Sequence, residues 1–175
     1  MRNLLELPLW SKKGVANVVV ETPRGARAKF AFDPEIGAFT YSKPMTWGLA
    51  YPTDWGFFPS TLAEDGDALD ALIIHDIQTF PGLVVECRII GVLETLETRK
   101  RKTARNDRVI VVPLASHRDQ RLDDVSMLTP EVKSELEGFF SATNALKKKH
   151  CEFRGWHGPK AAMHLVERAS RRYLG

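Results

Sequence analysis

Hydrophobic residues follow two different patterns along this chain, and the change between them limits the folds open to it. Apolar runs rich in valine and isoleucine occupy residues 69–74, 84–93 and 108–114. Short runs of this kind, bounded by turn residues, are typical of buried strands. Shorter runs at 15–20 and 29–32 flank the turn sequence Pro23-Arg24-Gly25, and these predict two further strands.

The segment from residue 37 to residue 59 is harder to interpret. Residues 37–41 form another candidate strand, after which prolines and glycines punctuate a stretch rich in tryptophan and phenylalanine. Because proline and glycine interrupt regular structure, we expect this stretch to be mostly loop, packed by its aromatic residues.

The last third of the chain predicts two helices. The first follows Thr129-Pro130 and carries apolar or partly apolar residues at helical spacing: Val132, Leu136, Phe139, Phe140, Thr143 and Leu146. The second follows Gly158-Pro159 and carries a similar stripe: Ala162, Leu165, Val166, Ala169 and Tyr173. Strands followed by terminal helices predict an α+β fold, with a small closed or partly open β-barrel.

Size and composition are those of one ordinary domain. The chain has 175 residues, 43% of them apolar, so we expect a single domain over residues 1–175. A formal charge of +3 is too small to indicate a nucleic-acid or membrane partner, and no window approaches the ~20 apolar residues of a membrane span. Cys87 and Cys151 form no disulfide framework or zinc pattern, which favours a cytoplasmic location.

Three carboxylates are crowded into six residues, at Asp65, Asp67 and Asp70, with Gly66 allowing a tight turn between the first two. If a strand begins near Ala68, the three can converge on one point, where a hard cation such as Mg²⁺ would offset their repulsion. A solvated acidic turn is an equally good interpretation of the aspartates alone. An EF-hand is excluded, because its sixth and twelfth positions require glycine and glutamate but hold Asp70 and Asp76.

The motifs around these aspartates resemble those of family I soluble inorganic pyrophosphatases. The likeness rests on Tyr51-Pro52-Thr53-Asp54-Trp55-Gly56-Phe57, Glu64 to Asp70, Pro81-Gly82 and Gly91-Val92-Leu93, and continues more weakly through Val111-Val112-Pro113, Phe139-Phe140 and Gly155-Trp156. The resemblance implies an OB-like five-stranded barrel with C-terminal helices, a homo-oligomer, and hydrolysis of pyrophosphate with Mg²⁺, or with Mn²⁺ in its place.

The resemblance also implies roles for individual residues. Asp65 and Asp70 would ligate the activating metals, and Asp67 would orient or deprotonate the attacking water. Lys29 and Lys43 fall where the family places cations for phosphate, and Trp55 stands where a tyrosine hydroxyl would contact it. Two further residues, Glu21 and Tyr51, would support the site.

Several positions depart from the family pattern. Glu97 matches a metal-binding aspartate in charge, whereas the next metal position falls on Asn106 and the following lysine on Arg108. Asp107 would point to the opposite face of a regular strand, so only a bulge could bring it to the metal. Ala31 replaces a glutamate, and Thr143-Asn144 replaces a tyrosine-lysine pair.

Two basic segments lie near these departures. The run Lys147-Lys148-Lys149 is expected to be a solvated helix end, with partial substitution for the lost cation as the alternative. The insert from Arg99 to Arg108 is expected to be a flexible exposed loop, and without interleaved aromatics it lacks the stacking platforms of a single-strand nucleic-acid site.

Three functions are consistent with these residues. The first is hydrolysis of pyrophosphate by a metal-activated water. The second is hydrolysis of an organic diphosphate, whose second group would pack on Trp55. The third is a degenerate member that binds phosphate without turnover, although crowded carboxylates are costly without a metal.

Overall fold

The computed structural model describes residues 3–100, 102–145 and 149–175. After a short 3-10 helix at Leu4–Glu6, the strands are β1 (Trp10–Lys12), β2 (Val15–Thr22), β3 (Ala28–Asp33), β4 (Ala38–Pro44), β5 (Asp54–Phe57), β6 (Asp70–Ile73), β7 (Val84–Arg99), β8 (Lys102–Arg105), β9 (Arg108–Pro113) and β10 (His150–His157). A second 3-10 helix spans Val125–Met127, and the two α-helices are α1 (Pro130–Ala145) and α2 (Pro159–Leu174).

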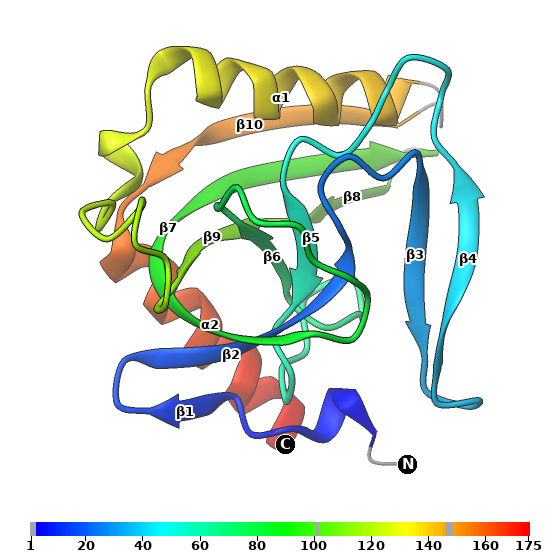
Figure 1. Ribbon diagram of the computed structural model, residues 1–175. Helices are drawn as coiled ribbons and strands as arrows, with labels where there is room; N and C mark the ends of the chain where they lie inside the picture. The colour runs from blue at the N-terminus through cyan, green and yellow to red at the C-terminus, as the bar shows by residue number, and fades with distance from the viewer. Residues whose placement is uncertain (1–2, 101, 146–148) are drawn as a thin grey trace.

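Five strands close into a ring. β2 pairs with β5, β5 with β6, β6 with β9, β9 with β7, and β7 returns to pair with β2. β1, β8 and β10 extend this ring, and β3 and β4 form a separate two-stranded sheet beside it (Figure 1). The predicted α+β fold with an OB-like five-stranded barrel and C-terminal helices is therefore confirmed.

Two apolar clusters explain why the barrel strands read as continuous hydrophobic runs. Along β9, Val109 and Val111 belong to a cluster that includes Ala162, Val166 and Ala169 of α2. The intervening residues of β9 belong to a second cluster, which includes Leu136, Phe139 and Phe140 of α1. Strands covered on both faces have no solvent side, so their sequences do not alternate.

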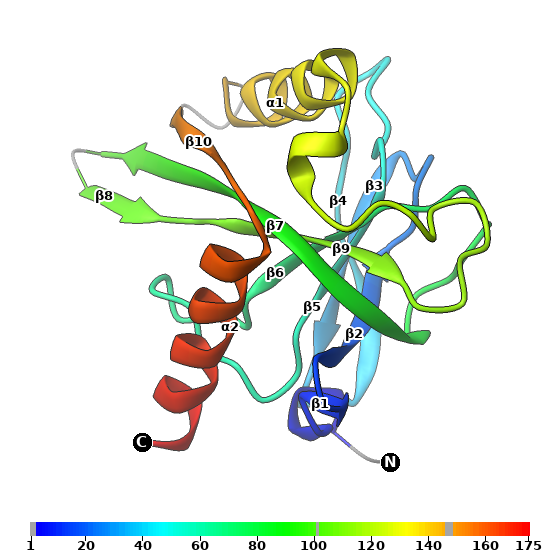
Figure 2. The ribbon, with the colours of Figure 1, turned by 90° about the vertical axis from the view of Figure 1, so that its left-hand side faces the viewer.

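Both predicted helices form where their apolar stripes indicated. α1 lies along β10, and α2 packs against β7 (Figures 1 and 2). The buried residues of α1 include Leu136, Phe139 and Phe140, which are three and four residues apart and so share one face. Leu146, the last residue of the predicted stripe, lies outside the described residues. In the described part of the chain, no helix is long and apolar enough to cross a membrane.

Four strands were missed by the sequence interpretation: β1, β5, β8 and β10. β5 lies in the segment expected to be loop, and its Gly56 has no room for a side chain, because a Cβ there would collide with the Val19 carbonyl. β10 follows α1 and alternates between exposed and partly buried residues, as an edge strand beside β7 does. Its mixed composition gives little hydrophobic signal.

The missed strand β8 corrects the view of the basic insert. β7 continues to Arg99 and pairs with β8, so the insert forms a β-hairpin rather than a flexible loop, with Thr98 opposite Thr103. The hydroxyls of these two threonines lie 2.8 Å apart, and threonine favours strands. Figure 2 shows the hairpin extending away from the body of the protein.

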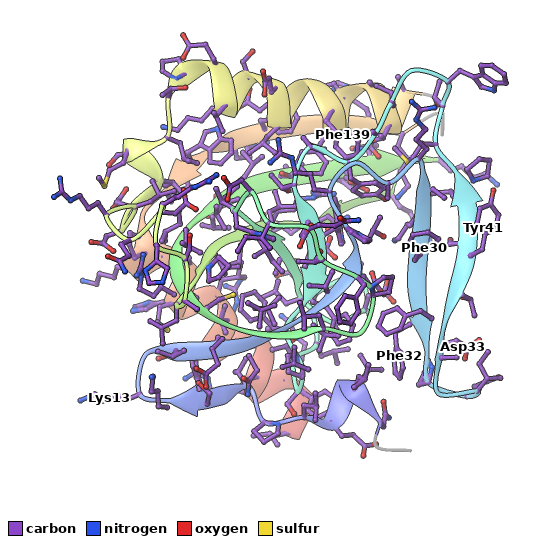
Figure 3. All side chains as sticks on the ribbon, viewed as in Figure 1. Lys13, Phe30, Phe32, Asp33, Tyr41 and Phe139 are labelled. Atoms are coloured by element: carbon purple, nitrogen blue, oxygen red, sulfur yellow. The ribbon has the colours of Figure 1, made fainter. Side chains whose placement is uncertain are left out.

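The β3–β4 sheet is held against the barrel by aromatic packing. The ring of Phe32 lies 5.3 Å from that of Phe39 and 6.4 Å from that of Phe57 on β5, measured between centroids. Figure 3 shows Phe32 between β3 and the barrel. This contact fixes β3 and β4 beside the barrel, and their residues Lys29 and Lys43 reach the pocket described next.

Candidate active site

A pocket of about 520 Å³ is lined by residues of β3, β4, β5, β6, β7, β9, α1 and neighbouring loop segments. Of the site residues predicted from the sequence, only Glu21 and Asp107 do not line it. The residues that do are Lys29, Lys43, Tyr51, Trp55, Asp65, Asp67, Asp70, Glu97, Asn106 and Arg108. Residues more than 100 positions apart in the chain therefore meet in one place, as a catalytic site requires.

The carboxylates lie on the turn that leads into β6. Gly66 has a φ of 95°, a left-handed conformation that suits glycine, and the Asp67 amide donates to Asp65 Oδ1 at 3.3 Å. Asp65 and Asp67 are exposed, whereas Asp70 begins β6 and is partly buried. The indole Nε1 of Trp55 donates to Asp70 Oδ1 at 3.2 Å, which fixes that carboxylate in the pocket wall.

Burial raises the pKa of Asp70 to about 7. The positive charges of Arg108 and Lys29 act in the opposite direction, while Glu21 and Asp65 add to the rise. A nearby cation would favour the charged form of this carboxylate. Asp70 is therefore a group whose charge depends strongly on what lies beside it.

Asp65, Asp67 and Asp70, which were expected to converge on one point, line the same pocket without forming a compact cluster in this structure. Among the residues described, no three Asp, Glu, His or Cys side chains are close enough to hold an ion between them. The reason is geometric, because Asp65 and Asp67 project from an exposed turn while Asp70 is held by Trp55. The donor set still fits Mg²⁺, which commonly takes one or two carboxylates and keeps several waters.

Positive charge gathers on the β3–β4 side of the pocket. Lys29 and Lys43 are directly opposite each other in the β3–β4 register, and both line the pocket. Like charges in opposed positions of a strand pair are destabilising by themselves. An anion between them would relieve that repulsion, so this pair is suited to phosphate.

A second group of charges surrounds Glu97 at the far end of β7. Arg108 Nη2 donates to Glu97 Oε1 at 2.7 Å, Lys149 Nζ donates to Glu97 Oε2 at 3.0 Å, and Asn144 Nδ2 donates to Glu97 Oε1 at 3.2 Å. Burial alone would raise the pKa of Glu97, but Arg108 and Lys149 lower it to about 2. Glu97 is therefore ionised and well satisfied.

Arg108 is almost fully buried, and aromatic rings form its surroundings. Its guanidinium lies 4.7 Å from the centroid of Phe140 and 5.7 Å from that of Trp55. Its Nη1 donates to the Asn106 carbonyl. Among the described residues, its Nε has no hydrogen-bond partner. A buried donor without a partner costs free energy, which the neighbouring ion pair and rings offset.

Asn106 links the two charged groups of the pocket. With its amide oriented to satisfy both neighbours, its nitrogen donates to Asp70 Oδ2 and its oxygen accepts from Arg108 Nη2, each at 3.3 Å. The Asn106 side-chain oxygen, which could have ligated a metal, therefore faces the Arg108 guanidinium instead.

Asp107 lies outside the pocket, and the bulge that would have brought it to a metal does not occur. Its Oδ1 accepts from the Thr95 amide at 2.9 Å, and its Oδ2 accepts from Arg105 Nε at 2.9 Å. Because neighbouring residues of a strand point to opposite faces, the placement of Arg108 in the pocket sends Asp107 away. Its position is structural.

Glu21 and Tyr51 flank the site in different ways. Glu21 does not line the pocket; its Oε1 accepts from the Phe32 amide at 2.9 Å, and burial raises its pKa. Tyr51 is buried in the pocket wall, with ring centroids 6.0 Å from Trp55 and 5.2 Å from Phe139. Both residues hold other parts of the site in place.

Lys149 corrects the view that the lysine run is solvated. Its pairing with Glu97 places it in the pocket wall, and its amide donates to the Asn144 carbonyl at 3.1 Å. Lys147 and Lys148 lie outside the described residues. The signal in the sequence was the position of the run just after α1, but the partner that captures Lys149 lies 52 residues earlier.

Comparison with known proteins places the chain in a family. The inorganic pyrophosphatase family model matches residues 18–174. The chain belongs to the inorganic pyrophosphatase family. An inorganic pyrophosphatase of Thermus thermophilus is 38% identical over 179 residues, covering 100% of both chains, and one of Synechocystis is 34% identical, covering 98% and 99%.

Solved structures of pyrophosphatases extend the match to three dimensions. The crystal structure of the Thermus thermophilus inorganic pyrophosphatase superposes with a TM-score of 0.92 at 36% identity, covering 99% of this chain and 100% of that one. An inorganic pyrophosphatase of Helicobacter pylori gives a TM-score of 0.87 at 26% identity, covering 97% and 99%. The pyrophosphatase fold is therefore present over nearly the whole chain.

Proposed function

We propose that this chain hydrolyses inorganic pyrophosphate to two phosphates, with Mg²⁺ or Mn²⁺ held by Asp65 and Asp70. The observation that carries the proposal is the meeting of Asp65, Asp67 and Asp70 with Lys29, Lys43 and Arg108 in a single pocket. Carboxylates suit a hard divalent cation, and fixed cations suit phosphate oxygens. A metal-bound diphosphate needs carboxylates for the metal and cationic side chains for its phosphate oxygens.

The protein's own residues divide the work. Lys29 and Lys43 bind phosphate oxygens from the β3–β4 side, and Arg108 binds them from β9. Asp67 orients the attacking water and accepts its proton, and Trp55 holds Asp70 in position through its indole N–H. A bound divalent ion would lower the pKa of that water and neutralise charge on the departing phosphate.

The decisive experiment is an assay of phosphate release from pyrophosphate over a range of Mg²⁺ and Mn²⁺ concentrations. Folded protein should release two phosphates per pyrophosphate, and removal of the metal with a chelator should stop the reaction. Folded protein that releases no phosphate at any metal concentration would refute the proposal and favour a phosphate-binding protein without turnover.

An organic diphosphate is a weaker candidate substrate, because Trp55 is not free to stack on it. Its ring is packed edge-on against Phe140, at 5.6 Å between centroids, and against Tyr51, and Arg108 lies over it. An aromatic ring already enclosed by neighbours offers little surface for a second group. A substrate panel should therefore rank pyrophosphate first.

The proposal extends to the setting in which the enzyme works. The described residues pack as one barrel with helices on it, in keeping with a single domain over residues 1–175. The free thiols of Cys87 and Cys151 accord with a cytoplasmic location, and membership of the family favours a homo-oligomer. Light scattering would measure the number of copies.

Replacing Lys29 by methionine should reduce kcat/KM for pyrophosphate by about 10- to 100-fold. The reason is the loss of one charge-assisted hydrogen bond to phosphate, worth ~1.5–3 kcal/mol. Lys13→Met is the matched control, since Lys13 is exposed at the β1–β2 turn, far from the pocket (Figure 3). Equal kinetics for the two variants would show that Lys29 does not contact the substrate.

A further inference from the structure

Glu97 accepts hydrogen bonds from donors in three other parts of the chain. Glu97 itself is on β7, Arg108 begins β9, Asn144 is in the last turn of α1, and Lys149 lies between α1 and β10. The three donor distances to its oxygens are 2.7, 3.2 and 3.0 Å. Arg108, Asn144 and Glu97 are buried, while Lys149 keeps a 27% exposed side chain.

These contacts leave Glu97 poorly placed to ligate a metal. An ionised carboxylate has about four lone-pair sites, and three of them already accept hydrogen bonds. Two of the donors are cations, which would repel a divalent ion brought to the same oxygens. A metal here would have to displace a buried ion pair, whereas Asp65 and Asp67 are exposed and have no such partner among the described residues.

The same contacts leave Lys149 with donors to spare. Two cations surround one carboxylate, so the group is positively charged overall. Lys149 has three N–H donors, uses one on Glu97 and keeps part of its side chain exposed, whereas the Nε of Arg108 is enclosed by protein atoms. Both side chains line the pocket that holds Lys29 and Lys43. Spare donors on a positive wall are suited to phosphate oxygens.

We infer that Lys149 is a substrate-binding residue and that Glu97 is a positioning residue, which holds Lys149 and Arg108 toward the diphosphate and is not a metal ligand. This inference rests on the proposed function for the identity of the anion. Asn144 completes the arrangement, because its side chain donates to Glu97 while its carbonyl accepts from the Lys149 amide. These contacts hold the Lys149 side chain in place relative to the C-terminal end of α1.

The test measures binding without turnover. Calorimetry with pyrophosphate in excess chelator should show that wild type binds the anion and that Lys149→Met binds about 10-fold more weakly, the order expected for one charge-assisted contact. Lys149→Arg should stay within about threefold of wild type, since it keeps the charge. Lys102→Met is the matched control, because Lys102 is exposed on β8 and does not line the pocket.

Glu97→Gln separates direct binding from an indirect effect. If Lys149 contacts the anion, Lys149→Met should weaken binding in the Glu97→Gln background as well. If Lys149 only neutralises Glu97, its replacement should have no effect there, and the inference would be overturned. Urea denaturation of each variant establishes that the protein measured is folded.

Metal affinity tests the second half of the inference. A Mn²⁺ titration should give Glu97→Gln an affinity within about threefold of wild type, whereas loss of a true carboxylate ligand should cost much more, as in Asp70→Asn. A 10-fold loss of Mn²⁺ affinity in Glu97→Gln would overturn the positioning role. The inference would also be overturned if the wild-type protein did not bind pyrophosphate in excess chelator. Wild type that binds the anion through Lys149 but never hydrolyses it would refute the proposed function alone.

Discussion

Replacing Asp67 by asparagine should lower kcat for pyrophosphate by about 10²- to 10⁴-fold while the protein remains folded. Asp67 is exposed on the turn before β6 and faces the pocket, so the change removes a base without opening the core. Asparagine has nearly the same shape but cannot accept a proton from water. Steady-state phosphate release at saturating Mg²⁺ measures the effect.

Glu64→Gln is the control for this prediction. Glu64 is in the same acidic turn, yet it lies outside the candidate active site, and its carboxylate is 3.8 Å from both Arg168 and Arg172 of α2. Removing its charge should leave kcat within about twofold, because exposed ion pairs of this kind contribute little. If Asp67→Asn and Glu64→Gln had the same activity, Asp67 would not be the base.

Binding measurements then locate the defect. Asp67→Asn should retain its affinity for chelator-treated pyrophosphate within a few-fold, since the cations of the pocket are untouched. A variant that lost substrate affinity instead of kcat would assign Asp67 to binding. The variant thus separates an enzyme from a binder without turnover, because such a binder would have no rate to lose.

Local hydrophobic patterns were sufficient to predict the strands that are buried on both faces and the helices that bury one face. In β9, Val109 to Val112 are apolar and fill two clusters, so this run of valine and isoleucine predicted the strand directly. α1 was predicted because Leu136, Phe139 and Phe140 share one face. Strands that lack this signal, β5 with its Gly56 and the half-exposed β10, depend on partners distant in sequence.

The candidate site shows the same division. The alternation of a strand predicted that Asp107 would point away from Arg108, and the contacts with Thr95 and Arg105 show that it does. By contrast, the capture of Lys149 by Glu97 joins residues 52 positions apart, and no local pattern in either segment encodes it. Spacing can identify candidate ligands, but the choice between metal and cation partners is made by tertiary contacts.

Asp54→Ala should destabilise the protein by about 2–4 kcal/mol, because hydrogen bonds to a charged group contribute ~1.5–3 kcal/mol each and are not fully additive. Asp54 is 1% exposed, and its Oδ2 accepts from His75 Nε2 at 2.7 Å and from Thr79 Oγ1 at 2.6 Å. Its Oδ1 accepts from the Arg24 amide at 2.7 Å. The replacement would leave these three partly buried donors without their acceptor, and urea denaturation measures the loss.

The proton on His75 follows from a fourth contact. His75 Nδ1 accepts from the Ile77 amide at 3.1 Å, so Nε2 carries the proton that is donated to Asp54. The network therefore joins the turn after β2, the start of β5 and the loop after β6. Asp76→Ala is the matched control in that loop, because Asp76 pairs with the exposed Arg118 and its loss should cost less than about 1 kcal/mol.

The pH dependence gives this prediction a second readout. Burial would raise the pKa of Asp54, but the hydrogen bonds from His75, Thr79 and Arg24 lower it below its ordinary value of 3.8. A carboxyl whose folded pKa is depressed stabilises the protein fully above its unfolded pKa, and the stabilisation is lost as pH falls through the folded value. Asp54→Asn keeps the shape without the charge, so the stability gap between it and wild type should be constant from about pH 8 to 5 and narrow below about pH 4.

Trp55 connects this network to catalysis. Trp55 follows Asp54 on β5, and successive strand residues point to opposite faces of the sheet. The hydrogen bonds that anchor Asp54 on one face therefore help to fix the Trp55 indole on the other. That indole holds Asp70 at 3.2 Å. In folded Asp54→Asn protein, Mn²⁺ affinity should therefore fall by a few-fold, whereas Asp76→Ala should leave it unchanged. Unaltered Mn²⁺ affinity together with lowered stability would confine the network to folding.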